Sequence, residues 1–192
     1  MPSLTRNPRA FLRVRRGSLE GEMANPHPQT GGSGHLARHD GLEIGHRADP
    51  YRERAKVAEP CVCPDCGASV HDGRWTWQPA SPGAASHRCP ACRRIHDRVP
   101  AGELTLEGPF LAAHEGEILQ LLTHVEARIR QEHPLERQMA MHQDAGHGRT
   151  VVTFTGTHIT HGVAQALLGA FAGEMQASWP EGGAPIRIRW SR

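Results

Sequence analysis

The spacing of the cysteines constrains this chain more than any other feature of its sequence. The first CxxC pair stands in residues 63–67 (CPDCG) and the second in residues 89–92 (CPAC), with 22 residues between Cys66 and Cys89. Two such pairs are typical of a site in which four thiolates surround one metal ion. We therefore expect one structural Zn²⁺, in a treble-clef or zinc-ribbon module, bound by Cys63, Cys66, Cys89 and Cys92.

The residues within the pairs favour zinc over an iron–sulfur cluster, which is the main alternative. Pro64 stiffens the turn, and Gly67 permits a positive φ beside the metal, so that backbone N–H groups can point at the sulfurs. Four thiolates close a tetrahedral shell, which predicts a structural rather than a catalytic ion. The fifth cysteine, Cys61, has the wrong spacing and is interpreted as a free thiol. Metal-bound cysteines indicate a reducing compartment, and we expect a cytoplasmic protein.

Histidines are the other candidate ligands. His71, His87 and His96 lie near the pairs, but four thiolates suffice, so we interpret them as surface or supporting residues. His158 and His161 are three residues apart and offer an alternative shared metal site, although surface histidines explain them as well. No phosphate-binding glycine loop, GxSxG or HExxH motif is present, and the chain is predicted not to be an enzyme.

Composition divides the chain into three parts. Residues 1–58 are rich in Gly, Pro, His and Arg without periodicity, which predicts a disordered basic tail, and Met23 is an alternative start. Residues 59–103 form the zinc-ribbon module, and residues 104–192 an α+β domain. No run approaches the roughly 20 apolar residues that a membrane span requires.

The pattern of apolar residues predicts the elements of the α+β domain. Helical spacing indicates a helix that begins at Gly108-Pro109 and ends before His133-Pro134, and a second over 159–171 capped by Thr157. Alternation predicts paired strands around 139–141 and 151–154, and around 175–179 and 186–190. The expected order is α-ββ-α-ββ, with the helices packed on an antiparallel sheet. A further strand is expected within the zinc module, at residues 73–77.

Charge is unevenly distributed along the chain. Residues 61–100 carry five basic and three acidic side chains, whereas residues 101–140 carry three and seven. Arginine beside an aromatic ring suits a nucleic-acid surface, because one pairs with phosphate and the other stacks on a base. The alternative is that Trp75 and Trp77 pack under the zinc and that the arginine side chains are solvated. The candidate nucleic-acid-binding residues are Arg74, Trp75, Trp77, Arg88, Arg93, Arg94 and Arg98, and Arg187 and Arg189 would extend them.

From Cys63 to Trp190 the chain resembles a family of uncharacterised bacterial CPxCG zinc-ribbon proteins. The resemblance is carried by residues 63–68, 73–77, 89–110 and 132–135, and the run 89–110 is its most specific part. This family is distantly similar to the N-terminal zinc region of the adaptor that exports the large ribosomal subunit, which implies contact with RNA or the ribosome. The chain departs from the family at residues 155–161, where an expected Asp and Arg are missing.

These observations predict a non-enzymatic zinc-binding protein that associates with RNA or a ribosomal subunit. The alternative is a protein–protein interaction module in which the zinc is purely structural. In that case an acidic helix face would contact the partner, through Glu115, Glu117, Glu126 and Glu132.

Overall fold

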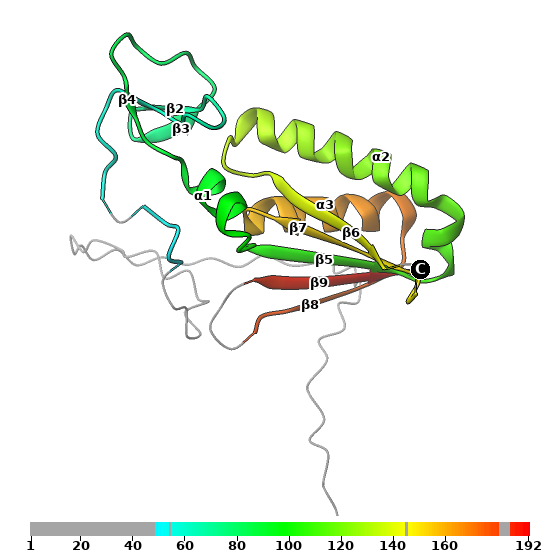
Figure 1. Ribbon diagram of the computed structural model, residues 1–192. Helices are drawn as coiled ribbons and strands as arrows, with labels where there is room; N and C mark the ends of the chain where they lie inside the picture. Colours follow the sequence, from blue (N-terminus) through cyan, green and yellow to red (C-terminus); the bar gives the residue numbers. More distant parts are fainter. Residues whose placement is uncertain (1–48, 54, 145, 181–184) are drawn as a thin grey trace, which may run out of the picture. The chain divides into compact units, whose positions relative to one another are not determined.

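The computed structural model describes residues 49–53, 55–144, 146–180 and 185–192 (Figure 1). The chain divides into two units, residues 1–40 and 41–192, and all described residues belong to the second. Most of the predicted tail and the alternative start at Met23 therefore lie outside the described residues. No helix in the described part combines the length and the apolar character of a membrane span.

The cysteine module is built on a small sheet of four short strands and one helix. The sheet has the order β3-β2-β1-β4, and β1 pairs antiparallel with β2 and parallel with β4. The β2–β3 hairpin turns at Asp72 and Gly73, which both have positive φ. It contains the strand predicted near residues 73–77. The elements are β1 (Cys61–Val62), β2 (Ser69–His71), β3 (Arg74–Thr76), β4 (Ala85–Ser86) and α1 (Pro90–Asp97).

The rest of the chain forms a five-stranded sheet with two helices, and the predicted α+β class is confirmed. The strand order is β6-β7-β5-β9-β8, and Figure 1 shows both helices on the same side of the sheet. The elements are β5 (Gly102–Glu107), α2 (Pro109–Glu132), β6 (Gln138–Asp144), β7 (Arg149–Phe154), α3 (Thr157–Phe171), β8 (Glu174–Ser178) and β9 (Ile186–Ser191).

The central strand β5 was not among the predicted elements, and it changes the sheet. It crosses the boundary that we placed between residues 103 and 104, and it pairs antiparallel with β7 and parallel with β9. The sheet is therefore mixed rather than wholly antiparallel. Both predicted strand pairs are present beside it, as β6–β7 and β8–β9.

Alternation along the strands separates a buried face from an open one. Leu104 and Leu106 of β5 are fully buried, as are Val152 and Phe154 of β7. They pack against apolar residues of α2 and α3 in a single core cluster, which burial of apolar area stabilises. The intervening residues of β5 and β9 face away from this core and include Glu103, Arg187 and Arg189.

The two long helices begin differently. α2 starts with Pro109 in its first turn and ends before His133, as predicted. The predicted Thr157 cap of α3 is wrong, because the N-cap residue is Gly156 and no side chain of the cap itself bonds the helix. Instead the Glu136 carboxylate accepts a hydrogen bond from Ile159 N at 3.0 Å. A Cβ on Gly156 would lie 2.1 Å from Glu136 Oε2, so glycine leaves room for this distant cap.

Gly102 provides a test of how closely β5 approaches α3. A Cβ at this position would lie 1.9 Å from Thr160 Oγ1, so Gly102→Ala should lower the free energy of unfolding by about 1–3 kcal/mol through overpacking. Gly169→Ala is the matched control, because no atom lies within 4 Å of its added Cβ. The control should stabilise the helix by about 0.5–1 kcal/mol. Urea unfolding followed by circular dichroism measures both, and equal effects would contradict the close packing.

Candidate metal centre

Four cysteine sulfurs converge at one point of the cysteine module. The Sγ atoms of Cys63, Cys66, Cys89 and Cys92 all lie within 4.8 Å of one another. Sulfurs about 2.3 Å from a tetrahedral zinc ion would be separated by about 3.8 Å, and Cys66 Sγ and Cys89 Sγ are 3.8 Å apart. The described residues contain no other such group of three or more His, Cys, Asp or Glu ligands. The four predicted cysteines are therefore arranged to bind one metal ion.

The two pairs reach this point by different local structures. Cys63 and Cys66 lie on a tight turn in which Cys63 N donates to Ala68 O at 2.7 Å and Gly67 adopts a φ of 78°. Cys89 is the N-cap of α1, with Cys92 in the first helical turn and Pro90 at its start. A turn, a hairpin and a helix that together supply the ligands correspond to the treble-clef form of the predicted module.

Backbone N–H groups prepare the site for negative sulfur. Cys89 N donates to Cys63 Sγ at 3.4 Å, and Cys92 N donates to Cys89 Sγ at 3.4 Å. Burial raises the pKa of Cys63, but N–H groups of Cys89, Asp65 and Cys66 outweigh it and bring that pKa to about 7. Burial raises the pKa of Cys89 and of Cys92. The set therefore fits a divalent cation, whose charge stabilises the thiolates that burial disfavours.

A buried arginine from the α+β domain completes the surroundings of the sulfurs. Arg137 precedes β6 and is only 6% exposed. Its Nη2 donates to Cys89 Sγ and to Cys92 Sγ, both at 3.3 Å. Burial lowers the pKa of Arg137, but the hydrogen bond to Cys92 and the nearby thiolate charge raise it overall. The guanidinium thus offsets part of the negative charge that four thiolates leave around a dication.

The backbone of Arg137 is held as firmly as its side chain. Arg137 N donates to Thr155 Oγ1 at 2.8 Å, and Thr155 N donates to Arg137 O at 2.9 Å. Thr155 Oγ1 also donates to Leu135 O at 2.6 Å. This network joins the loop after α2 to the end of β7. The Arg137 side chain therefore links the metal centre to the five-stranded sheet.

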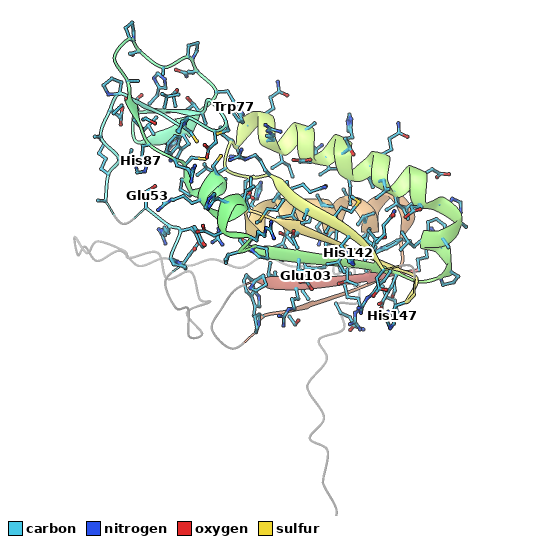
Figure 2. All side chains as sticks on the ribbon, viewed as in Figure 1. Glu53, Trp77, His87, Glu103, His142 and His147 are labelled. Carbon is cyan, nitrogen blue, oxygen red and sulfur yellow. The ribbon has the colours of Figure 1, made fainter. Side chains whose placement is uncertain are left out.

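The two candidate stacking residues, Trp75 and Trp77, contact other parts of the protein. Trp75 packs against the cysteine cluster and stacks with His87 at a centroid separation of 6.2 Å. Trp77 Nε1 donates to Arg130 O at 2.6 Å, near the end of α2, and the Arg130 guanidinium lies 5.5 Å from its ring centroid. Figure 2 shows Trp77 beside this helix. The alternative of Trp packing near the zinc therefore describes Trp75.

Three of the predicted nucleic-acid-binding arginines are paired within the chain. Arg94 is 4% exposed and forms an ion pair with Asp49 at 2.5 Å, so its guanidinium does not belong to the surface. Arg93 pairs with Glu53 at 2.8 Å and Arg88 with Asp65 at 2.6 Å.

Arg74 and Arg98 lie exposed, in β3 and after α1. On the open sheet face, Arg187 and Arg189 alternate outward along β9, separate from the cysteine module, and Arg189 lies 3.5 Å from Glu107.

The remaining candidates lie apart from the metal centre. Cys61 is 1% exposed in β1 and outside the four-sulfur cluster, and burial raises its pKa. His158 and His161 are exposed on α3, and His158 meets the ring of His133 edge-on at 5.2 Å. His87 Nε2 lies 3.2 Å from Glu53 Oε1 (Figure 2).

Arg137 and Glu136 were not among the predicted site residues. Both lie in a short connection after α2, and their partners are 48 and 23 residues away in the chain, at Cys89 and Ile159. No local sequence pattern predicts contacts between residues so far apart in the chain. The strongest available signal was that Glu136 and Arg137 are charged residues between two apolar elements.

Comparisons with models of protein families, with curated proteins and with solved structures found no match.

Metal content gives a direct test of the ligand set. We expect one metal ion per chain, and Cys63→Ser or Cys92→Ser should reduce the content well below one, since each removes a ligand. Cys61→Ser is the matched control and should retain the metal, because this buried cysteine lies outside the cluster. Mass spectrometry under native conditions measures the stoichiometry. If only the Cys61→Ser control lost its metal, the predicted ligand set would be wrong.

The role of Arg137 is tested by removing its charge. Arg137→Met should lower the free energy of unfolding by about 3 kcal/mol, because it leaves buried thiolate charge without its partner. Arg128→Met is the control, since Arg128 is exposed on α2 and should change stability by less than about 0.5 kcal/mol. The second readout is the rate of metal transfer to a chelator, which should rise only for Arg137→Met.

Proposed function

We propose that this is a non-enzymatic protein that binds one structural Zn²⁺ and associates with RNA or a ribosomal subunit. The carrying observation is the convergence of Cys63, Cys66, Cys89 and Cys92, whose sulfurs lie within 4.8 Å of one another. Four thiolates saturate a tetrahedral ion and leave no position for a substrate or a reactive water. Zinc prefers this ligand set, which supports its assignment over harder metals.

The same centre supports a binding role because it orients the surface around it. A reducing compartment such as the cytoplasm would keep the cysteines as thiolates, and all five are free of disulfides. Arg74 and Arg98 extend from the cysteine module into solvent, where guanidinium groups bind phosphate. Arg88 is also partly exposed, although it pairs with Asp65.

A specific observation supports the second candidate, a protein-interaction module. Arg88, Arg93 and Arg94 each pair with a carboxylate of the same chain, which reduces the charge offered to phosphate. On the acidic helix face, however, Glu115 accepts from Gln143 and Glu126 accepts from Gln138 N, which reduces what this face offers a partner. A single protein partner that remains bound after nuclease treatment would favour this candidate.

The proposed association is tested by binding to ribosomal subunits and to structured RNA over a range of salt concentrations. Binding should weaken as salt rises, because phosphate contacts release counterions. The double variant Arg74→Glu/Arg98→Glu should bind about tenfold less tightly, with a salt slope smaller by about two. Arg128→Glu on α2 provides the control for charge reversal elsewhere. Absence of binding by the unmodified protein at low salt would refute the association.

A further inference from the structure

A cavity of about 610 Å³ lies where the cysteine module meets the five-stranded domain. One side is formed by Asp49, by residues 51–53 and 55–57 and by β2, β3 and α1, and the other by residues 135–136 and 155–157. We call it the junction cavity. Its volume falls within the range of about 300–1,000 Å³ that small-molecule sites occupy. It is separate from the metal shell, which the four sulfurs close.

The junction cavity has an apolar and aromatic wall. Val57, Val70, Ala91 and Leu135 line it together with Trp75. The Trp75 ring is held by its packing against the cysteine cluster and by stacking with His87, at an interplanar angle of 22°. A ring already held in place offers a stacking surface that loses little entropy on binding a planar group.

Not every charged side chain along the junction cavity has an ion-pair partner. Asp49 pairs with Arg94, Glu53 pairs with Arg93, and Glu136 Oε2 caps α3. Arg52 and Lys56 also line the cavity, and their exposed side chains have no carboxylate partner among the described residues. The lining therefore combines an aromatic ring with two cations and one carboxylate, that of Glu136, for which no ion pair is formed among the described residues. It also offers a hydrogen-bond acceptor, because Glu136 Oε1 makes no bond with the described residues.

We propose that the junction cavity binds one unstacked nucleotide of a single-stranded RNA. The base stacks against Trp75, the phosphate pairs with Lys56 and Arg52, and Glu136 accepts a hydrogen bond from the base. This inference rests on the proposed association with RNA and names its contact site. An anion and a planar ring within one ligand match the two kinds of group that the lining leaves without partners.

In this arrangement the main contacts with RNA are not made by the arginines predicted from the sequence. Those at 88, 93 and 94 are paired within the chain, whereas Arg52 and Lys56 stand in a segment that composition assigned to the tail. Of the residues proposed to contact the nucleotide, only Trp75 was among the nucleic-acid-binding residues predicted from the sequence. RNA affinity should therefore respond more strongly to Lys56 than to Arg88.

The test uses the full chain loaded with zinc and a fluorescent single-stranded RNA of about ten nucleotides, at low salt. Lys56→Glu and Arg52→Glu should each weaken binding about tenfold, and Arg88→Glu and Arg128→Glu by less than about twofold. Ala55→Trp adds a bulky ring to an exposed lining residue without a charge change, and it should also weaken binding. The indole N–H resonance of Trp75, assigned with Trp75→Phe, should shift on titration with RNA.

The outcomes separate this inference from the proposed function. If the RNA binds but Lys56→Glu, Arg52→Glu and Ala55→Trp leave its affinity unchanged, the cavity is not the site, while the association with RNA stands. If single-stranded RNA, structured RNA and ribosomal subunits all fail to bind the unmodified protein at low salt, both this inference and the proposed function are wrong. A Trp75 resonance that does not move while RNA is bound also overturns the cavity assignment.

Discussion

The hydrogen bonds from Arg137 to the thiolates of Cys89 and Cys92 are the contact on which the arrangement of this protein depends. Burying the Arg137 guanidinium without the thiolates, or the thiolates without the guanidinium, would be unfavourable, because charged groups lose their hydration on burial. Arg137 Nε illustrates the cost, because it is buried without a hydrogen-bond partner. Both hydrogen bonds to the sulfurs are made by Nη2, at 3.3 Å. The Arg137 side chain therefore joins the cysteine cluster to the connection that leads into β6.

This coupling gives the metal a larger role than stabilising a small module. In an isolated zinc module, the ion supplies folding free energy to the residues between its ligands. Here the sulfurs that would hold the ion are also joined to the connection after α2, through Arg137 and its hydrogen bond to Thr155. The same connection places Glu136 at the N-terminus of α3. Two adjacent residues, Glu136 and Arg137, thus contact the start of α3 and the ligand sulfurs.

Local patterns were sufficient for part of this structure. The CxxC spacing identified the four clustered cysteines, and apolar periodicity located α2 and α3, because helical spacing is repeated over many residues. Strand β5 carries the alternating signal Leu104-Thr105-Leu106, but it is short and lies between a metal module and a helix. Its parallel partner β9 begins more than 75 residues later, and no local rule indicates such a pairing. The contact of Arg137 with the sulfurs could not be predicted from the sequence for the same reason, since it joins residues that only the tertiary fold brings together.

The parallel pairing of β5 with β9 has a consequence for how the chain acquires its structure. The cysteine module closes between residues 61 and 97, from contacts that are near in sequence. The centre of the large sheet requires residues 102–107 to meet 186–191, after two helices and three other strands have been made. Non-local pairing of this kind slows folding, because the intervening loop must be closed before its contacts form. During synthesis on the ribosome, the cysteine module can therefore form before β9 is available to pair with β5.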